Sequence, residues 1–211
     1  MGASCTRVDE KCTDHAKKIP LSIANKVSKS ICKINYILND EKVNGTGFFM
    51  IANKQKYIII CYHVLGKDLN NLDINIIIEI YNKKTKNIKL SNRDYEFFKK
   101  IDITLIEIKE SDKILKDINF LDYDSNFSKG YDQYINTDIF TLQYPKDEIE
   151  IASGKILEII DNFEFKHSID TDYGSSGSPI ILPNILKVIG IHKQGDRCEN
   201  FKYCSFIGEI I

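Results

Sequence analysis

Residues 173–179 read Tyr-Gly-Ser-Ser-Gly-Ser-Pro, and this stretch decides how the rest of the chain is interpreted. Small residues flank Ser176 on both sides, and glycine lets a backbone turn sharply. A nucleophilic serine needs an exposed hydroxyl beside backbone N–H groups that can bind an oxyanion. The stretch therefore predicts a reactive serine on a tight turn. Ser175 and Ser178 are the rival candidates, and the Gly-x-Ser-Gly frame favours Ser176.

Two polar residues far upstream complete a candidate catalytic set. His63 follows the apolar stretch 57–61, so the end of a strand would place its imidazole at a cleft. Asp102 precedes the apolar stretch 103–108, where a carboxylate is costly to bury unless it is hydrogen-bonded or paired. Taken singly, His63 could be a satisfied buried histidine and Asp102 a turn residue at a strand start. The order His, Asp, Ser across the chain indicates a base, an orienting acid and a nucleophile.

Short apolar segments rich in Ile, Tyr, Phe and Thr, separated by polar residues, predict a chain made of β-strands. No long segment has a convincing helical period, and turns recur at the spacing of a sandwich or barrel. We expect helical turns only at Leu21–Ser28 and at residues 62–66. The expected strands are residues 31–38, 45–51, 57–61, 74–81, 88–90, 103–108, 139–143, 155–160, 178–182, 187–192 and 203–210.

Composition fits an ordinary globular chain. The 211 residues are 43% hydrophobic and 28% charged, with a formal net charge of −1, so no nucleic-acid partner is expected. The charged first thirty residues lack the apolar core of a secretory signal, which predicts a cytoplasmic protein. The six cysteines are therefore expected as free thiols. A Cys198–Cys204 disulfide is the alternative. No metal site is expected, although these cysteines and His192 leave a zinc option open.

The first six residues, Met-Gly-Ala-Ser-Cys-Thr, match the pattern for N-terminal myristoylation. Gly2 would carry the myristoyl group, and Cys5 could take a palmitoyl group. One acyl chain anchors a protein only marginally, so the second signal would matter. The pattern predicts a possible contact with a membrane surface, and a chance match is the alternative.

Five segments in order resemble the trypsin/chymotrypsin-like serine peptidases: residues 45–49, 61–65, 102–105, 174–179 and 188–192. The resemblance implies an all-β fold of two six-stranded antiparallel β-barrels with the site between them. It covers residues 30–211, with barrels at about 30–115 and 130–211. Residues 1–29 would form an N-terminal extension.

The same resemblance implies a serine endopeptidase that acts on protein or peptide substrates without a cofactor. Ser176 would attack the scissile carbonyl, His63 would transfer the proton, and Asp102 would orient His63. Backbone N–H groups of Gly174 and Ser176 would form the oxyanion hole. Ser175 stands where secreted digestive members have an aspartate that binds a newly cut N-terminus, so activation by that route is not expected.

Specificity is suggested by two residues at pocket positions. Thr171 and His192 match the residues that contact the P1 side chain in glutamyl endopeptidases and in viral cysteine relatives that cut after Gln. A preference for Glu or Gln at P1 follows. Asp170 lies where trypsin has the aspartate that selects Lys or Arg, and Thr171 and His192 could merely line the wall. We expect His15 and His167 to be ordinary surface or loop histidines.

Two other functions compete with the protease. The bulky pair Cys61-Tyr62 before His63 could displace the imidazole, which would leave an inactive fold that binds peptides or acts as a scaffold. A lipid- or ester-directed hydrolase would normally carry Gly-x-Ser-x-Gly in an α/β chain, and this chain reads as β throughout.

Overall fold

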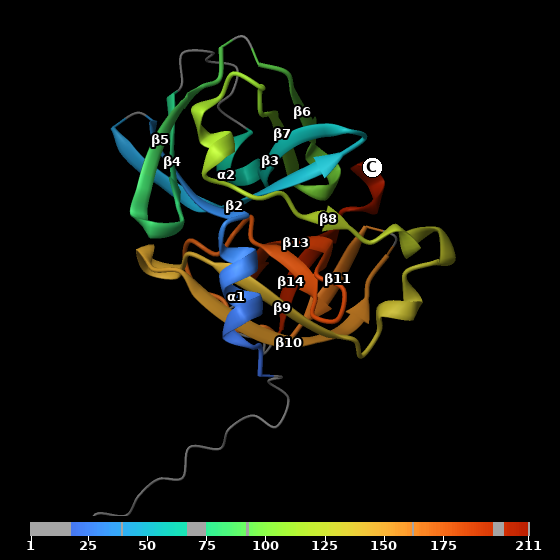
Figure 1. The fold of residues 1–211 in the computed structure, drawn as a ribbon. Helices are drawn as coiled ribbons and strands as arrows, with labels where there is room; N and C mark the ends of the chain where they lie inside the picture. The colour runs from blue at the N-terminus through green and yellow to red at the C-terminus, as the bar shows by residue number, and fades with distance from the viewer. Residues whose placement is uncertain are drawn as a thin grey trace, which may run out of the picture.

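The computed structural model describes residues 18–38, 40–66, 75–91, 93–161, 163–195 and 201–210. They form two halves, each built on a strongly curved sheet, which lie one above the other in Figure 1. The first half is an antiparallel sheet with the strand order β5-β4-β1-β2-β3-β7-β6. Its strands are β1 (Ile31–Leu38), β2 (Glu41–Ala52), β3 (Gln55–Cys61), β4 (Asn75–Ile80), β5 (Lys84–Lys89), β6 (Tyr95–Phe98) and β7 (Ile103–Glu107).

The second half is a closed barrel. Its strand order is β12-β9-β10-β11-β14-β13, and β12 also pairs with β13, which closes six antiparallel strands into a ring. The short strand β8 pairs in parallel with the start of β13, at Lys187 and Val188. The strands are β8 (Asp122–Tyr123), β9 (Asp138–Gln143), β10 (Glu150–Ile159), β11 (Glu164–His167), β12 (Pro179–Leu182), β13 (Lys187–Gly195) and β14 (Lys202–Phe206). This arrangement confirms the all-β, chymotrypsin-like fold class expected from the sequence.

Alternating burial explains why these segments are strands. In β4 the side chains of Ile76, Ile78 and Ile80 are buried, whereas Asn75 and Ile77 between them are exposed. Successive side chains of a strand point to opposite faces, so this period of two puts one face on the core. Branched isoleucine side chains suit such a pleated surface.

The β2–β3 hairpin sets the position of one site residue. Asn53 and Lys54 form its turn with φ angles of 49° and 68°. Two positive φ angles in a two-residue turn match the right-handed twist of the flanking strands. Strand β3 ends at Cys61 and continues directly into α2 (Tyr62–Leu65), so the hairpin fixes where His63 lies.

Helices are short, as the sequence predicts. The expected helix α1 (Leu21–Ser28) is confirmed, and α2 falls within the expected turn at residues 62–66. In the described residues, 3₁₀ turns occur at Tyr81–Lys83, Lys99–Ile101, Lys113–Lys116, Ser125–Lys129, Asp132–Tyr134, Pro145–Asp147 and Gly208–Ile210. The expected strand at 203–210 was too long, because β14 stops at Phe206 and the chain turns at Gly208–Ile210.

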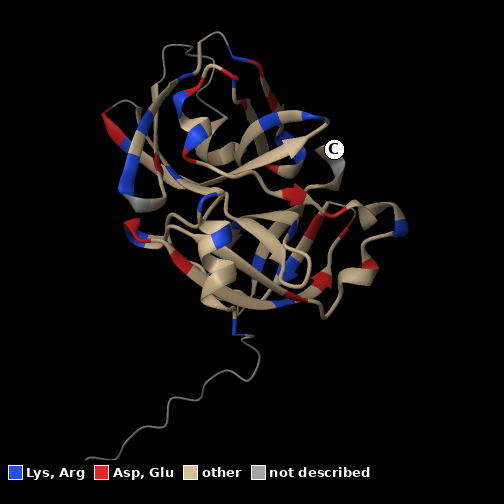
Figure 2. Cartoon of the chain, in the orientation of Figure 1, with Lys and Arg blue, Asp and Glu red and all other residues tan. Residues whose placement is uncertain are grey.

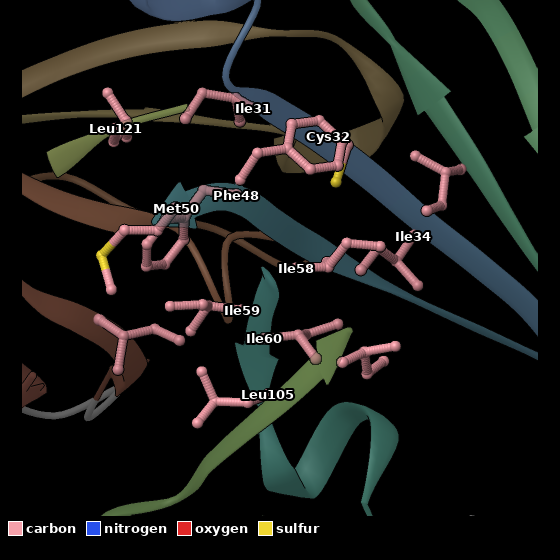
Figure 3. Close-up of a cluster of buried hydrophobic side chains, with 14 of the residues drawn as sticks. Ile31, Cys32, Ile34, Phe48, Met50, Ile58, Ile59, Ile60, Leu105 and Leu121 are labelled. Atoms are coloured by element: carbon pink, nitrogen blue, oxygen red, sulfur yellow. The ribbon is translucent and has the colours of Figure 1, made fainter. Parts of the chain in front are cut away.

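One hydrophobic core joins the two halves. Side chains from β1, β2 and β3 interleave at its centre, where Ile31, Phe48 and Ile59 are fully buried (Figure 3). The same cluster continues into the second half through Phe140 of β9 and Ile191 of β13. A second cluster fills the closed barrel. Because the halves share packed side chains, the loops between them are held by rigid structure on both sides.

Charged residues of both signs are interspersed along the chain in both halves in Figure 2. Mixed charge of this kind is typical of a solvated surface. No helix in the described part of the chain has the length and apolar character needed to cross a bilayer.

Candidate active site

His63 and Asp102 form the closest contact of the site. The Nδ1 atom of His63 lies 2.6 Å from Oδ2 of Asp102, and the backbone N–H of His63 donates to Oδ1 at 2.8 Å. Both carboxylate oxygens therefore hold the same residue, one through its ring and one through its backbone. The His63 side chain is 39% exposed and that of Asp102 only 16%, so the imidazole faces solvent with the acid behind it.

Asp102 is held by an unusual backbone conformation. It follows the turn Lys99–Ile101 and adopts φ 57° and ψ 41°, a left-handed geometry that aspartate tolerates better than most residues. Its carbonyl accepts a hydrogen bond from the N–H of Tyr62 at 2.9 Å. Burial raises the pKa of the Asp102 carboxyl, but its hydrogen bonds with His63 and the charges of His63 and Lys193 outweigh burial. The net pKa lies below the ordinary value, so the acid stays ionised at neutral pH.

Ser176 is the accessible serine of its loop. Ser175 and Ser178 are fully buried, and the Ser178 hydroxyl donates to the Ser175 carbonyl at 2.8 Å. The Ser176 hydroxyl instead donates to the carbonyl of Lys193 at 2.8 Å. Among the described residues, no hydrogen bond joins the Ser176 hydroxyl to the His63 ring. Catalytic hydrogen bonds are often long or poorly aligned in the absence of substrate. The missing bond therefore does not exclude Ser176 and His63 as a nucleophile and its base.

The backbone of the serine loop points two N–H groups away from its internal hydrogen bonds. The Tyr173 carbonyl accepts from the N–H of Lys146 at 3.1 Å, and the Ser175 carbonyl accepts from the N–H of Ser178 at 3.0 Å. In a trans peptide the N–H points opposite to the carbonyl. The N–H groups of Gly174 and Ser176 are thereby turned outward, and no hydrogen bond within the described chain uses either of them.

Both halves of the molecule hold this loop. In β2, the Thr46 hydroxyl donates to the Gly174 carbonyl at 2.8 Å and accepts from the Tyr144 N–H at 3.0 Å, while the Thr46 N–H donates to the Ser176 carbonyl at 2.9 Å. Gly177 adopts a φ of 94°, and a Cβ there would lie 2.0 Å from the Thr46 carbonyl oxygen. The close approach therefore requires glycine.

The loop also meets the strand that leads to His63. The His192 carbonyl in β13 accepts from the Gly177 N–H at 2.8 Å and from the Cys61 thiol at 3.2 Å. Gly177 follows Ser176, and Cys61 ends the strand before His63. The structure thus brings the His, Asp and Ser segments together at the junction of the two halves.

The side chain of Tyr62 does not crowd His63, contrary to the concern raised by its bulk. Its ring packs edge-on against Phe97 with 5.6 Å between ring centroids, and it lies over the bare α-carbon of Gly66. The contact between His63 and Asp102 is kept. This geometry does not favour the inactive scaffold.

The three candidate pocket residues, Asp170, Thr171 and His192, differ in how exposed they are. His192 is 2% exposed, Thr171 is half-buried, and Asp170 is exposed. No hydrogen bond among the described residues links Thr171 to His192. Because the Asp170 carboxylate lies in solvent, it is poorly suited to bind a buried cation.

His167 corrects one expectation. It was expected to be a surface or loop histidine, but it lies in β11, is fully buried, and its Nε2 is 3.3 Å from Nδ1 of His192. No strong sequence signal marks β11, because the segment Glu-Phe-Lys-His at 164–167 alternates but is short and charged. The neighbouring Cys204 is a buried free thiol.

Lys193 is a second residue that sequence reasoning missed. Its carbonyl binds the Ser176 hydroxyl, its charge lowers the pKa of Asp102, and its ammonium forms an ion pair with Glu164. Lys193 lies at an irregularity in the β13–β14 pairing between His192 and Gln194. Such a local register shift is not visible in sequence.

Four residues named from the sequence lie outside the described residues: Gly2 and Cys5 of the lipidation pattern, His15, expected as a surface or loop histidine, and Cys198 of the alternative disulfide. No metal site was expected, and within the described residues two groups of His, Cys and Asp side chains lie close enough together to be compared with a metal site. They are His167, His192 and Cys204, and Cys61, His63 and Asp102, each with ligand atoms within 4.8 Å of one another.

Comparison with known proteins gives a consistent picture of the fold. No protein-family model matches the chain, and no curated protein matches it significantly. Among solved structures, a serine endoprotease from Yersinia pestis superposes with a TM-score of 0.68 at 12% identity, over 92% of this chain and 65% of that one. The active form of the Rv3671c protease from M. tuberculosis gives 0.68 at 16% identity, over 89% and 80%.

A human astrovirus serine protease gives a TM-score of 0.60 at 16% identity, over 92% of this chain and 94% of that chain. Each superposition covers most of the chain, so the closed barrel and the curved sheet together match one known fold. The chain has the trypsin/chymotrypsin-like protease fold.

Proposed function

We propose that the chain is a serine endopeptidase that hydrolyses peptide bonds with Ser176, His63 and Asp102. The observation that carries the proposal is the 2.6 Å contact between His63 Nδ1 and Asp102 Oδ2, with the Ser176 loop fixed beside it. Because Nδ1 is engaged by the acid, Nε2 of His63 is the nitrogen free to act as a base. The protease fold of the compared structures supports the same reaction.

The reaction follows from these roles. Ser176 Oγ attacks the substrate carbonyl carbon while its proton passes to His63 Nε2, and Asp102 stabilises the resulting imidazolium. The carbonyl oxygen becomes an oxyanion, which the N–H groups of Gly174 and Ser176 would bind. The imidazolium then protonates the leaving amine. A water molecule repeats the sequence and releases the acyl group.

Substrate preference is the finer part of the proposal. His192 is buried near the serine loop and could donate a hydrogen bond to a Gln or Glu side chain at P1, with Thr171 at the pocket wall. A site that hydrogen-bonds its ligand discriminates strongly against ligands that lack the partner. The exposed position of Asp170 supports this preference over Lys or Arg.

Active-site labelling with a fluorophosphonate, followed by peptide-library profiling, tests the function. We expect a covalent adduct on Ser176, and we expect Ser176→Ala to lose both the adduct and peptide cleavage while its unfolding midpoint stays unchanged. Ser176 makes one side-chain hydrogen bond and is partly exposed, so its loss should cost little stability.

Ser168→Ala is the matched control, because Ser168 is an exposed serine outside the serine loop whose hydroxyl accepts a hydrogen bond from the Lys155 N–H. It should label and cleave like the wild type. A folded wild-type protein that yields no adduct on Ser176 and cleaves no peptide would overturn the proposal.

We also propose that acylation at Gly2 and Cys5 holds the protease at a membrane surface. The support is the sequence pattern alone, since both residues lie outside the part of the chain that the structure describes. Two acyl chains together would give the stable anchoring that one cannot.

A further inference from the structure

Three groups form a directed chain of hydrogen bonds inside the closed barrel. The backbone N–H of Ile169 lies 3.1 Å from Nδ1 of His167, and Nε2 of His167 lies 3.3 Å from Nδ1 of His192. The first donor fixes the direction of the rest, because a backbone N–H can only donate. Nδ1 of His167 must therefore be an acceptor without a proton.

The position of each proton follows from that first bond. A neutral histidine carries one proton, so His167 carries its proton on Nε2 and donates it to Nδ1 of His192. Nδ1 of His192 is then also without a proton. His192 consequently carries its own proton on Nε2.

Burial keeps both rings neutral. Loss of solvent lowers the pKa of His192 to about 3, with the charges of Lys202 and His63 acting in the same direction. Burial also lowers the pKa of His167 well below its ordinary value, helped by His192 and Lys202. At neutral pH each of the two rings therefore carries one ring proton, and His167 remains the donor and His192 the acceptor of the bond between them.

The Nε2 atom of His192 is left as a free donor. No hydrogen bond among the described residues uses it. It is also absent from the fully buried polar atoms that lack a partner in this part of the chain, so the 2% of His192 that remains exposed includes this nitrogen. The carbonyl of the same residue binds the Gly177 N–H, one residue from Ser176. The residue that carries this donor therefore lies next to the serine loop.

We propose that His167 is a positioning residue that presents His192 as a neutral Nε2–H donor, and that the P1 pocket therefore selects the amide of Gln over the carboxylate of Glu. This inference rests on the proposed protease function and narrows its substrate class. It assigns a role to His167, which does not touch the substrate and acts through His192.

Solvation energy separates the two side chains. A Gln amide oxygen accepts the Nε2–H bond and brings no charge into the pocket. A Glu carboxylate gains the same bond but loses its hydration, and a neutral imidazole supplies no opposite charge to offset the loss. Lys202 is the cation that acts on both histidines, but its side chain lies against Gly195, three residues farther along β13.

The same hydrogen bonds argue against a metal ion held by His167, His192 and Cys204. A metal needs the lone pair of the nitrogen that faces it. The Ile169 N–H forces the proton of His167 onto Nε2, the atom that faces the cluster. Burial also raises the pKa of the Cys204 thiol well above its ordinary value, which disfavours the thiolate that would bind metal.

Two variants at position 167 separate positioning from packing. His167→Gln keeps an amide N–H that can donate to His192 and an oxygen that can accept from the Ile169 N–H. His167→Phe keeps the ring shape but removes both functions. Each variant is compared with the wild type by nitrogen-15 NMR of the imidazoles and by kcat/KM on two peptides that differ only in Gln or Glu at P1.

We expect the wild type to show His192 neutral with its proton on Nε2 and to favour Gln by about tenfold or more. His167→Phe should reduce the Gln-to-Glu ratio by about fivefold or more, because the buried Nδ1 of His192 loses its donor. His167→Gln should keep the wild-type ratio and tautomer. Fluorophosphonate labelling of Ser176, which does not use the P1 pocket, should proceed at similar rates in all three proteins.

The inference is overturned if wild-type His192 carries its proton on Nδ1 or is cationic at neutral pH. It is equally overturned if His167→Phe keeps the wild-type ratio while its Ser176 is labelled normally. Failure of Ser176 to label in the folded wild type would contradict the protease function instead, and the NMR spectra would still decide whether His167 sets the tautomer of His192.

Discussion

Asp102 shows how much of the site depends on a single residue. Its left-handed backbone, its two bonds to His63 and its carbonyl bond to Tyr62 all act together. A residue in such a conformation costs about 1–3 kcal/mol and persists only where its surroundings fix it. Here the surroundings are the end of β3 and the start of β7, where Cys61 pairs with Ile103. The acid is thus positioned by the sheet rather than by its loop.

Replacement of Asp102 by Asn should separate catalysis from stability. The amide cannot hold the His63 tautomer or stabilise the imidazolium, so kcat should fall by about 10⁴-fold. We expect the fold to survive, because the amide oxygen can still accept the His63 backbone bond. The measurement is kcat on the best peptide from library profiling, alongside the urea midpoint.

Asp112→Asn is the matched control. Asp112 is also a poorly exposed carboxylate, and it forms a two-pronged pair with Arg93 at 2.6 Å per contact, away from Ser176. This control should lower the urea midpoint and leave kcat unchanged. Similar loss of kcat in both variants would show that the effect of Asp102→Asn comes from the fold.

Candidate site residues could be predicted from the sequence where they stand in a motif. They could not be predicted where their place in the site depends on contacts between distant strands. Ser176, His63 and Asp102 each stand in a short recognisable pattern, and the structure brings their segments together. His167 and Lys193 stand in no pattern. Their positions depend on how β11 and β13 pair with β14 across the closed barrel, and pairing between distant strands leaves no local trace in sequence.

At the level of elements, β2 holds the serine loop through Thr46. The Thr46 hydroxyl joins two backbone groups of the second half, the Gly174 carbonyl and the Tyr144 N–H, and is itself fully buried. A strand of one half thereby fixes the loop of the other. The reactivity proposed for Ser176 should be sensitive to this contact, although Thr46 is not one of the proposed reacting groups.

Replacement of Thr46 by Val should destabilise the protein and slow the labelling of Ser176. Valine has the same shape but leaves the buried Tyr144 N–H and the partly buried Gly174 carbonyl without this partner, which should cost about 2 kcal/mol or more. The freed Gly174 carbonyl can then reorient its peptide and disturb the outward N–H groups. Urea unfolding and the rate of fluorophosphonate labelling measure the two effects.

Thr104→Val offers a matched control in the same half. Thr104 is also fully buried in a strand, β7, but its hydroxyl has no hydrogen-bond partner. The same chemical change there should leave stability unchanged or raise it, and should leave labelling unchanged. If both variants behave alike, Thr46 does not hold the loop.

Most strands could be predicted, and the exceptions have physical reasons. Long apolar segments such as β1 and β3 carry their own signal, because β-branched residues suit a buried sheet. The strands β6, β8 and β11 were not predicted, since they have only 4, 2 and 4 residues. Segments so short form strands only because longer neighbours offer them an edge, which is a tertiary effect.

At the level of the whole molecule, the buried pair of His167 and His192 makes the free energy of unfolding depend on pH. His167 and His192 lie inside the closed barrel, where charging either ring would place a cation in an apolar interior. Unfolding releases both rings to water, where their ordinary pKa is near 6.5. The two histidines therefore bind protons in the unfolded chain at pH values where they stay neutral in the folded chain.

The sign of the effect follows from linkage. Below about pH 6.5 the unfolded state holds more protons than the native state, so the free energy of unfolding rises with pH and falls on acidification. Each neutral buried histidine contributes a slope of about 1.4 kcal/mol per pH unit until its folded pKa is reached. For His192 that limit is about 3. Urea unfolding curves at pH values from about 7 to 4 should therefore show falling stability.

A variant identifies the groups responsible. His167→Phe removes one titrating ring, so its stability should fall less steeply between about pH 6 and pH 5, by the slope of one histidine. Carboxylates with lowered pKa values, such as Asp102 and Asp112, begin to lose their contribution only below about pH 5, as the unfolded forms near their ordinary pKa of 3.8 start to bind protons, so the histidine slope is read above that pH. A wild-type stability that stays constant from neutral pH to about 4.5 would contradict the buried neutral pair, because no other described group is held neutral against protonation in that range.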